Sequence, residues 1–360
     1  MRDDPAPLAD GPEGAGDPSA LPEGERPAPD RPPDTTPPPT ASRSTDVQSL
    51  AGWVRVVGGA ILFALALRVF AFEAYRIPST SMEDTLLVGD FVLVSKLHYG
   101  PRVLGRRLPG VDDPDRGDVA VFNYPPDLAP NLARRTPYIK RVVGLPGDTL
   151  AVVAKRVRIG REAEALPRDG RQSWQVEGRL PSAERLAALG LAGRVQRLAD
   201  GRWAVSATSD QAQGLRQASG VTSVEPRLRP SGDGSAAFPA AFHYSLDDYG
   251  PVVIPRQGAT VALDDLSWPV IRTVIERFEG HAAERTAEGF LIDGRPAETY
   301  TFAQDYFFVL GDSRDDSADS RTWGFVPFDH LIGKAVAVYF SWDEDAGAVR
   351  WDRIGRGIRE

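Results

Sequence analysis

A run of 17 residues, from Val56 to Phe72, contains a single charge, at Arg68. A helix needs about 20 apolar residues to cross a bilayer, and about 17 is the low end. Trp53 and Tyr75 flank the run and suit the two membrane interfaces, while Arg55 and Arg68 can extend toward headgroups. The run therefore favours a membrane-spanning helix over a buried core helix or an amphipathic surface helix. Its flanking positive charges do not fix the orientation.

The segment ahead of this run, residues 1–52, has the composition of a disordered tail. It holds 12 of the 31 prolines, no aromatic residue and a net charge of −6 out of −8. Such a segment has too little apolar surface to offset chain entropy. It is also too long and too acidic for the start of a cleavable signal peptide. The remaining chain is nearly neutral, which argues against a nucleic-acid binder with its basic face.

Several kinds of chemistry find no support in the sequence. The chain has no cysteine, which excludes a disulfide scaffold, a thiol nucleophile and a cysteine zinc site. Its four histidines are scattered and form no metal-ligand pair, and no phosphate-binding glycine loop or G-x-S-x-G turn is present. We therefore expect neither a metal nor a nucleotide cofactor.

From Ile77 onward the pattern is typical of short strands, and the length of 360 residues suggests about two domains. Between about 155 and 300, helical patches alternate with strands. Helices are predicted at Ser182–Leu191 and Trp268–Phe278, with Ser182 and Ser267 as N-caps. Strands are predicted at Phe91–Val94, Asp118–Tyr124, Tyr138–Val143, Thr149–Val153, Tyr306–Leu310 and Ala335–Phe340.

Three segments are unusual for connecting loops. They are Ile77–Asp90, with three hydroxyls between a proline and a methionine, Tyr138–Asp148, and the charged stretch Gly311–Pro327. Taken singly, Lys140 is most simply an exposed lysine and Ser81 a turn serine. The third segment would be a solvated turn, since it lacks the central glycine and closing glutamate of a calcium loop.

Together and in this order, these segments resemble bacterial type I signal peptidases, which are membrane-bound proteases with a Ser/Lys dyad. The P-S-x-S-M-x-P-T-L box of that family stands here at 78–86, and its R-G-D box with the following apolar run at 116–122. The Y-I-K-R-x-x-G-L-P-G-D box is matched in full at 138–148. The last box, G-D-N-R-D-N-S-x-D-S-R, corresponds to 311–321 and is followed by W-G-F-V-P.

The resemblance implies that Ser81 is the nucleophile and Lys140 the general base. A serine hydroxyl needs an adjacent base, and a lysine serves as one only when it is neutral. Its pKa must then fall by several units from about 10.4, which burial achieves by disfavouring the ammonium form. The apolar neighbours of Lys140 suit this requirement.

Further roles follow from the resemblance alone. Ser317 would orient the Lys140 amine, while the Ser79 hydroxyl and the Ser81 backbone N–H would form an oxyanion hole. Asp319 and Arg321 would form a structural ion pair near the dyad. The family cleaves after small residues at −1 and −3, and apolar walls would shape the pockets that accept them. These wall residues would be Ile77, Pro78, Met82, Leu86, Val121, Tyr138 and Ile139.

Three positions depart from the family pattern. Asp84 replaces a proline, which we expect to loosen the chain after the nucleophile and to add a charge. Ser313 and Asp316 replace asparagines. Asp316 would raise the pKa of Lys140 if it faced the dyad, since an anion favours the ammonium form, but we expect it to face solvent.

The expected fold is mainly β, an antiparallel catalytic core of the signal-peptidase type with an α+β insert, behind one transmembrane helix. The expected domains are a tail at 1–52, an anchor at 53–75, a catalytic core at 76–154 and 300–341, an insert at 155–299 and a C-terminal tail at 342–360. The family further implies a single-pass protein of the bacterial inner membrane with an extracytoplasmic catalytic domain. Its partners would be signal peptides of exported preproteins, membrane lipid and, by proximity, the secretion machinery.

Two alternatives remain open. One is a related Ser/Lys membrane protease with a specialised substrate, such as a pilin-processing peptidase; a self-cleaving repressor is disfavoured by the membrane segment. The other is an inactive membrane-anchored scaffold whose 155–299 region binds a partner. The presence of both dyad residues argues against the scaffold.

Overall fold

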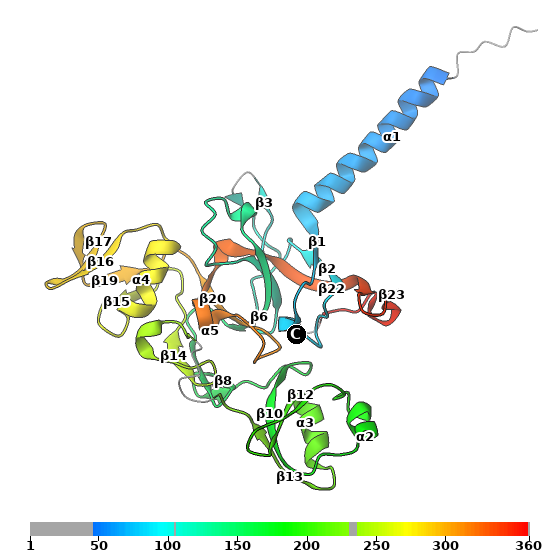
Figure 1. Ribbon diagram of the computed structural model, residues 1–360. Helices are drawn as coiled ribbons and strands as arrows, with labels where there is room; N and C mark the ends of the chain where they lie inside the picture. The colour runs from blue at the N-terminus through cyan, green and yellow to red at the C-terminus, as the bar shows by residue number, and fades with distance from the viewer. Residues whose placement is uncertain (1–45, 104–105, 230–235, 359–360) are drawn as a thin grey trace, which may run out of the picture. The chain divides into compact units, whose positions relative to one another are not determined.

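The computed structural model describes residues 46–103, 106–229 and 236–358 (Figure 1). The predicted disordered tail lies outside these residues except for its last seven positions, 46–52, which are helical instead. The chain divides into two compact units, Met1–Val56 and Val57–Glu360. The described part of the first unit is helix throughout, and the second unit carries the sheets and the candidate site.

The apolar run forms a helix long enough to cross a membrane. Helix α1 (Asp46–Ala66) continues into a π-helical turn (Leu67–Ala71), and Gly52–Ala71 is the candidate span. Its large apolar side chains are exposed, with Trp53 at 70% and Leu62 at 70%. The predicted anchor extended to residue 75, but Phe72 already begins strand β1 (Phe72–Arg76). This strand joins the sheet because its backbone pairs with β2 (Asp90–Ser95) from Phe72↔Ser95 onward.

An antiparallel eight-stranded sheet forms the framework, in the order β1-β2-β22-β5-β6-β20-β21 with β23 beside β22. The strand order places the last long strand, β22, between β2 and β5. The further bounds are β5 (Val119–Asn123), β6 (Pro137–Gly144), β20 (Tyr306–Leu310), β21 (Val326–Pro327), β22 (Leu331–Asp343) and β23 (Ala348–Val349). All six predicted strands are present, five of them in this sheet. Helix α5 (Ser320–Trp323) follows β20, and β3 (Arg102–Val103) pairs with β4 (Arg106–Arg107).

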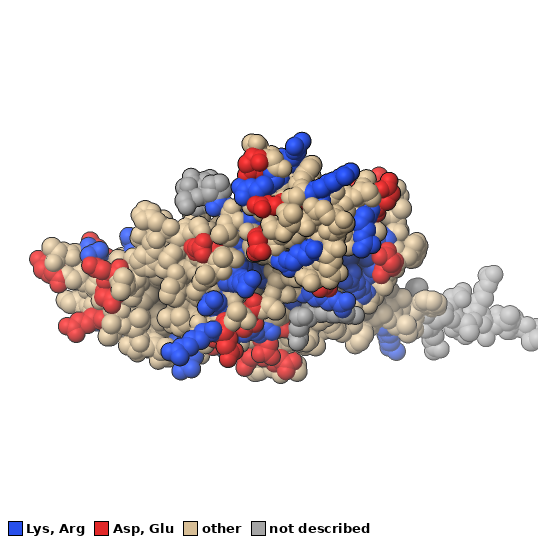
Figure 2. Space-filling view, turned by 90° about the horizontal axis from the view of Figure 1, so that it is seen from below, with Lys and Arg blue, Asp and Glu red and all other residues tan. Residues whose placement is uncertain are grey.

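The sheet buries two separate apolar clusters. One contains Ile77, Met82 and Leu86 against Val121, and the other contains Phe122, Val142 and Trp323. Neighbouring residues of β5 enter different clusters because successive side chains of a strand point to opposite faces. The charged residues of the face drawn in Figure 2 are of both signs and interspersed.

The predicted insert, 155–299, contains two parts that pack differently. The first is a four-stranded sheet in the order β11-β12-β10-β13 with its own core, which includes Trp174 and Leu215. Its elements are β10 (Arg171–Gly178), α2 (Ala183–Ala188), β11 (Val195–Arg197), β12 (Trp203–Thr208), α3 (Ser209–Arg216) and β13 (Val221–Pro226).

The second part shares its core with the main framework. Tyr249 and Ile271 of this part belong to one buried cluster with Phe308 of β20 and Phe325. Strand β7, placed in the catalytic core by sequence, pairs with β14 of this part, so the insert has no clean boundary at residue 155. The elements are β7 (Thr149–Val153), β8 (Arg156–Ile159), β9 (Glu162–Ala163), β14 (Tyr249–Val253), β15 (Thr260–Ala262), α4 (Trp268–Arg277), β16 (Ala283–Thr286), β17 (Gly289–Ile292), β18 (Arg295–Ala297) and β19 (Thr299–Thr301).

Both predicted helices form, with different N-termini. The Ser182 hydroxyl accepts a hydrogen bond from the Arg185 N–H and caps α2. Ser267 occupies the N-cap position of α4, but its hydroxyl makes no capping hydrogen bond and donates to the Ala262 carbonyl. Pro269 lies in the first turn of α4, as predicted.

The predicted C-terminal tail, 342–360, belongs to the folded core instead. Strand β22 runs on through Asp343, and β23 pairs with its end. Arg353 is 4% exposed, and its guanidinium binds the fully buried Asp90 carboxylate at 2.5 Å. Sequence reasoning missed this contact because its partner lies 263 positions earlier in the chain.

Candidate active site

Ser81 lies in a tight turn that follows β1. The chain leaves the strand at Arg76, and Thr80–Met82 forms a single 3₁₀ turn. Met82 and Leu86 anchor this loop, because both side chains are fully buried in the sheet core. Ser81 itself is 8% exposed, so little solvent reaches its hydroxyl.

Lys140 reaches the same point from β6. Its ammonium nitrogen, Nζ, lies 2.8 Å from Ser81 Oγ and 2.8 Å from the Ile139 carbonyl oxygen. The residue is 3% exposed. Burial lowers the pKa of Lys140 to about 8, although Asp319 and Asp312 act in the opposite direction. A lysine at this pKa is neutral in about a tenth of molecules at pH 7, which suits a general base.

A third segment closes the site from the C-terminal side. The Ser313 N–H donates to the Ser81 carbonyl at 3.0 Å. Gly311 is required here, because a Cβ at this position would lie 2.2 Å from Ser317 Oγ and 2.6 Å from the Ser81 carbonyl oxygen. The absence of a side chain at Gly311 therefore lets this loop approach the nucleophile.

The residues predicted to support the dyad are near it in different ways. Ser79 Oγ lies 3.3 Å from Ser81 Oγ, on an exposed residue. Ser317 Oγ is buried and makes no hydrogen bond to Lys140, while its interaction with the Asp319 carboxylate helps to lower the pKa of Asp319. Its orienting role stays a prediction. Asp319 and Arg321 form a fully buried ion pair at 2.8 Å.

The buried Asp319–Arg321 pair holds the last segment in shape. Burial alone would raise the pKa of Asp319, but the Arg321 guanidinium brings it below its ordinary value. Asp319 also accepts the Gly311 N–H at 3.1 Å, and Arg321 donates to the carbonyls of Leu246 and Arg314. The pair thus fixes the backbone that carries Gly311 and Ser317.

A second buried ion pair was missed by sequence reasoning. Arg141, next to Lys140, donates from two nitrogens to the two oxygens of Asp312, at 2.8 and 2.7 Å. The Thr85 hydroxyl donates to the same carboxylate at 2.6 Å. The three segments that resemble the family are therefore joined through one carboxylate. The signal was present, since all three residues lie within the quoted segments, but no spacing rule pairs them.

The predicted substrate-lining residues do not all lie together. Ile77, Met82, Leu86 and Val121 share one buried cluster, with Ile139 packed against it. Pro78, which follows Ile77 in the chain, is exposed. Tyr138 packs instead against the other sheet cluster, stacked on Tyr124 with ring centroids 4.2 Å apart, and Lys140 Nζ lies 5.4 Å from the centre of the Tyr138 ring. The reason is the alternation of β6, which directs Tyr138 and Ile139 to opposite faces.

The expectation that Asp84 loosens the chain after the nucleophile is wrong. Its backbone adopts a left-handed φ of 75°, and its carboxylate pairs with Arg171, which is 1% exposed. Arg194 approaches Asp84 at 3.7 Å and Glu83 at 3.1 Å. The first part of the insert therefore contacts the nucleophile loop through two arginines.

Asp316 is exposed, as expected, and its carboxylate accepts the Thr80 hydroxyl next to Ser81. Arg171 is also tied to the last segment, through its N–H to the Asp312 carbonyl at 2.8 Å and its carbonyl to the Arg314 N–H at 2.8 Å. The insert thus touches both loops around the dyad.

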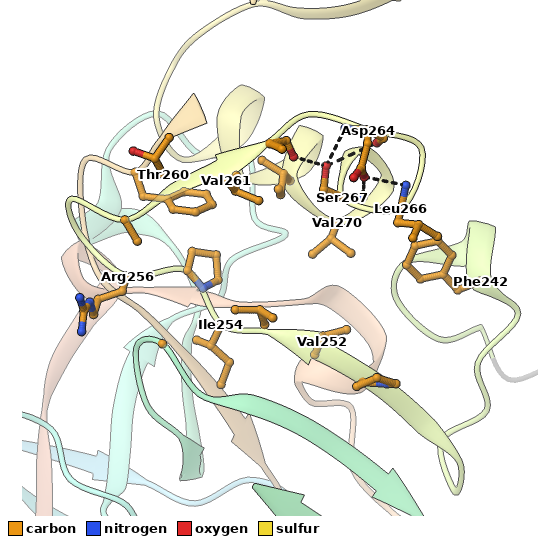
Figure 3. Close-up of a pocket in the computed structure, with 18 of the residues that line it drawn as sticks. Phe242, Val252, Ile254, Arg256, Thr260, Val261, Asp264, Leu266, Ser267 and Val270 are labelled. Atoms are coloured by element: carbon orange, nitrogen blue, oxygen red, sulfur yellow. Dashed lines mark hydrogen bonds between the residues drawn. The ribbon is translucent and has the colours of Figure 1, made fainter. Parts of the chain in front are cut away.

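A large apolar cavity lies elsewhere. It has a volume of about 780 Å³ and runs between β14 and the start of α4 (Figure 3). Four apolar side chains point toward it, those of Val252, Ile254, Val261 and Val270. Two polar residues also line it, and the Ser267 N–H donates a hydrogen bond to the Asp264 carboxylate. None of its lining residues belongs to the predicted site. Within the described residues, no group of three metal-ligating side chains is present either.

Comparison with known proteins gives a consistent result. The sequence profile of the family described as "Signal peptidase, peptidase S26" matches residues 50–189 and 273–342. The signal peptidase I of Pseudomonas fluorescens is 31% identical over 297 residues, covering 79% of this chain and 70% of its own. The signal peptidase I of Aquifex aeolicus is 28% identical over 293 residues, covering 78% of this chain and 80% of its own. That of Buchnera aphidicola from Acyrthosiphon pisum is 27% identical over 303 residues, covering 80% and 76%.

Proposed function

The chain belongs to the signal peptidase family, peptidase S26, and we propose that it cleaves with Ser81 as nucleophile and Lys140 as general base. It is thus a type I signal peptidase, a serine endopeptidase that acts on signal peptides. The observation that carries the residue assignment is the 2.8 Å contact between Lys140 Nζ and Ser81 Oγ in a buried setting. Two groups far apart in sequence meet at hydrogen-bond distance, as nucleophile and base must.

In the first step, neutral Lys140 takes the proton of Ser81 as Oγ forms a bond to the scissile carbonyl carbon. The carbonyl oxygen then carries the negative charge. The Ser81 backbone N–H and the Ser79 hydroxyl would donate to this oxygen, which stabilises the charge as it develops. The 3.3 Å separation of the two hydroxyl oxygens supports this role for Ser79.

In the second step, the tetrahedral intermediate collapses and the C–N bond breaks. The Lys140 ammonium gives its proton to the departing amine, which becomes the N-terminus of the mature protein. Lys140 is then neutral again and takes a proton from the water that attacks the Ser81 ester. It returns this proton to Ser81 Oγ as the bond between Oγ and the acyl carbon breaks. The released acid is the cleaved signal peptide.

The proposed recognition of small residues rests on the buried cluster of Ile77, Met82, Leu86 and Val121 beside the dyad. Because these side chains are closely packed, the pockets proposed beside them would be shallow, so an alanine methyl would fit where a larger side chain would clash. Within this proposal, the positions accepted by these walls are −1 and −3.

We also propose a single-pass protein of the bacterial inner membrane whose catalytic domain is extracytoplasmic. The apolar helix Gly52–Ala71 supports one membrane crossing. Ser81 follows Ala71 by ten residues, so the nucleophile lies at most about 35 Å of extended chain from the span. Proximity to the bilayer, to its lipids and to the secretion machinery would bring membrane-held substrates to the dyad.

The assignment is tested with the detergent-solubilised full chain and a preprotein that carries an Ala-x-Ala cleavage site. We expect processing by the parent protein and none by Ser81→Ala or Lys140→Ala. Normal processing by either variant would disprove the dyad, and no processing by a folded parent would favour the inactive scaffold. Lys334→Ala is the control for removing a lysine of the same sheet, because Lys334 pairs with the Asp118 carboxylate and does not contact Ser81.

A further inference from the structure

A second cavity is lined by residues that follow the apolar helix in the chain and by residues of the strands that carry the site. It has a volume of about 750 Å³ and is bounded by Glu73 and Tyr75 of β1, by Asn123 and Pro137 at the ends of β5 and β6, and by Ile332 of β22. Its walls are mixed, with several charged side chains. It is therefore unlike the apolar cavity of Figure 3.

The cavity adjoins the dyad along two strands. Pro137 precedes Lys140 by three residues in β6, which is about 10 Å at the rise of a strand. Tyr75 and Ile332 also pack against the buried cluster that contains Ile77 and Val121. The cavity is therefore next to the buried cluster that contains Ile77 and Val121.

The cavity also adjoins the membrane span. Glu73 follows Ala71, the last residue of the span, by only two positions, or about 7 Å of chain. The headgroup layer of a bilayer is of similar depth. A signal peptide has its apolar helix upstream of the cleavage site, so the chain that connects that helix to the dyad crosses this cavity. At about 3.3 Å per residue, a distance of 10 Å corresponds to positions −4 to −6.

The charges of the cavity are unbalanced. Lys96, Arg102 and Arg135 line it together with one carboxylate, Glu73. Lys96 and Glu73 form an ion pair at 3.0 Å, which leaves the two arginines in excess. Arg135 donates to the Ala129 carbonyl at 2.9 Å and contacts His330, so its position is fixed without a carboxylate.

Arg102 is the least satisfied of these cations. Among the described residues, no hydrogen bond or ion pair engages its guanidinium, although the Asp329 carboxylate is near enough to influence it. Arg102 is half-buried, so this cation is partly removed from water, and the burial lowers its pKa. A half-buried guanidinium without a partner favours an anionic or neutral polar ligand and disfavours a cation.

We propose that this cavity binds positions −4 to −6 of the signal peptide and that Arg102 and Arg135 select against basic residues there. The proposal rests on the proposed function and adds a charge preference to it. The preference is electrostatic, so it acts beyond the small-residue rule at −1 and −3.

The test uses the solubilised full chain and peptides that share one Ala-x-Ala site and differ only at −5, which carries Glu, Gln or Lys. We expect kcat/KM for the Glu peptide to exceed that for the Lys peptide about three- to tenfold at low salt. Raising the salt concentration should reduce this ratio, because partly exposed charges are screened.

Variants connect the preference to the cavity. Arg135→Glu should bring the Glu-to-Lys ratio to one or below, and Arg102→Gln should reduce it by about half or more. Arg158→Glu is the control, because Arg158 is an exposed cation on β8 outside this cavity, and it should leave the ratio unchanged. The Gln peptide also reports a variant that has failed to fold.

The outcomes are separable. Two results would overturn the cavity proposal and leave the proposed function intact. One is cleavage of all three peptides at the same rate. The other is a Glu-to-Lys ratio that changes as much in Arg158→Glu as in the cavity variants. No cleavage of any peptide by the parent contradicts the proposed function itself. If Arg135→Glu leaves the ratio unchanged but abolishes stimulation by phosphatidylglycerol vesicles, the cavity binds lipid phosphate and the peptide proposal is wrong.

Discussion

At the residue scale, the protonation state of one lysine sets the chemistry. Lys140 is a base only when neutral, and burial lowers its pKa to about 8. The rate should therefore rise about tenfold per pH unit below pH 8 and level off above it. The rate falls as the pH falls because protonation of Lys140 removes the acceptor for the Ser81 proton. A kcat/KM profile from pH 5 to 10 measures this, and a flat profile over pH 5 to 8 would contradict a lysine base.

Gly311 is a second single position on which the site depends. Gly311→Ala places a methyl group against Ser317 and the Ser81 carbonyl, so the two loops must separate. A displacement of about 1 Å in an active site lowers the rate about 100-fold. We expect kcat/KM to fall by that factor, and we expect the unfolding temperature to fall only slightly. Gly357→Ala is the control, because its nearest neighbour would be the Val336 carbonyl oxygen at 4.0 Å. Equal activity of the two variants would contradict the tight approach.

At the element scale, the insert strand β10 supports the nucleophile loop through Arg171 and Asp84. Asp84→Asn keeps a residue that tolerates a left-handed φ but leaves the buried guanidinium without a carboxylate, a loss of about 1–3 kcal/mol. Asp84→Pro restores the residue of the family pattern but cannot adopt φ of 75°, and we expect a loss of about 3 kcal/mol or more. Urea unfolding measures both. A proline variant as stable as the asparagine variant would show that the loop shape is not required.

Most elements could be predicted from local pattern, and their partners could not. The strands Thr149–Val153 and Tyr306–Leu310 have the predicted bounds because turn residues flank each apolar run. The pairing of β7 with β14 escaped prediction, because it joins residues about 100 positions apart. The dyad itself was found through resemblance. Taken alone, a serine in a turn and a lysine in a strand gave no reason to expect a 2.8 Å contact.

At the scale of the whole molecule, the C-terminal segment stabilises the fold. Removing Arg353 leaves the Asp90 carboxylate buried without its guanidinium, and we expect Arg353→Ala to lower the free energy of unfolding by about 3–5 kcal/mol. The Arg356–Asp169 pair is exposed, so Arg356→Ala should change it by less than about 1 kcal/mol. Thermal and urea unfolding of the two variants measure the difference. Equal shifts would mean that the segment is a tail after all.

The place of β22 in the sheet also determines when the enzyme becomes active during its synthesis. β22 lies between β2 and β5, yet the ribosome makes it after both of them. The sheet therefore lacks the strand between β2 and β5 until residue 343 has left the ribosome. Because the pKa of Lys140 is lowered by burial in the complete fold, we expect Lys140 to stay protonated until then. The nascent chain is therefore inert, and proteolytic activity begins only with its final strands.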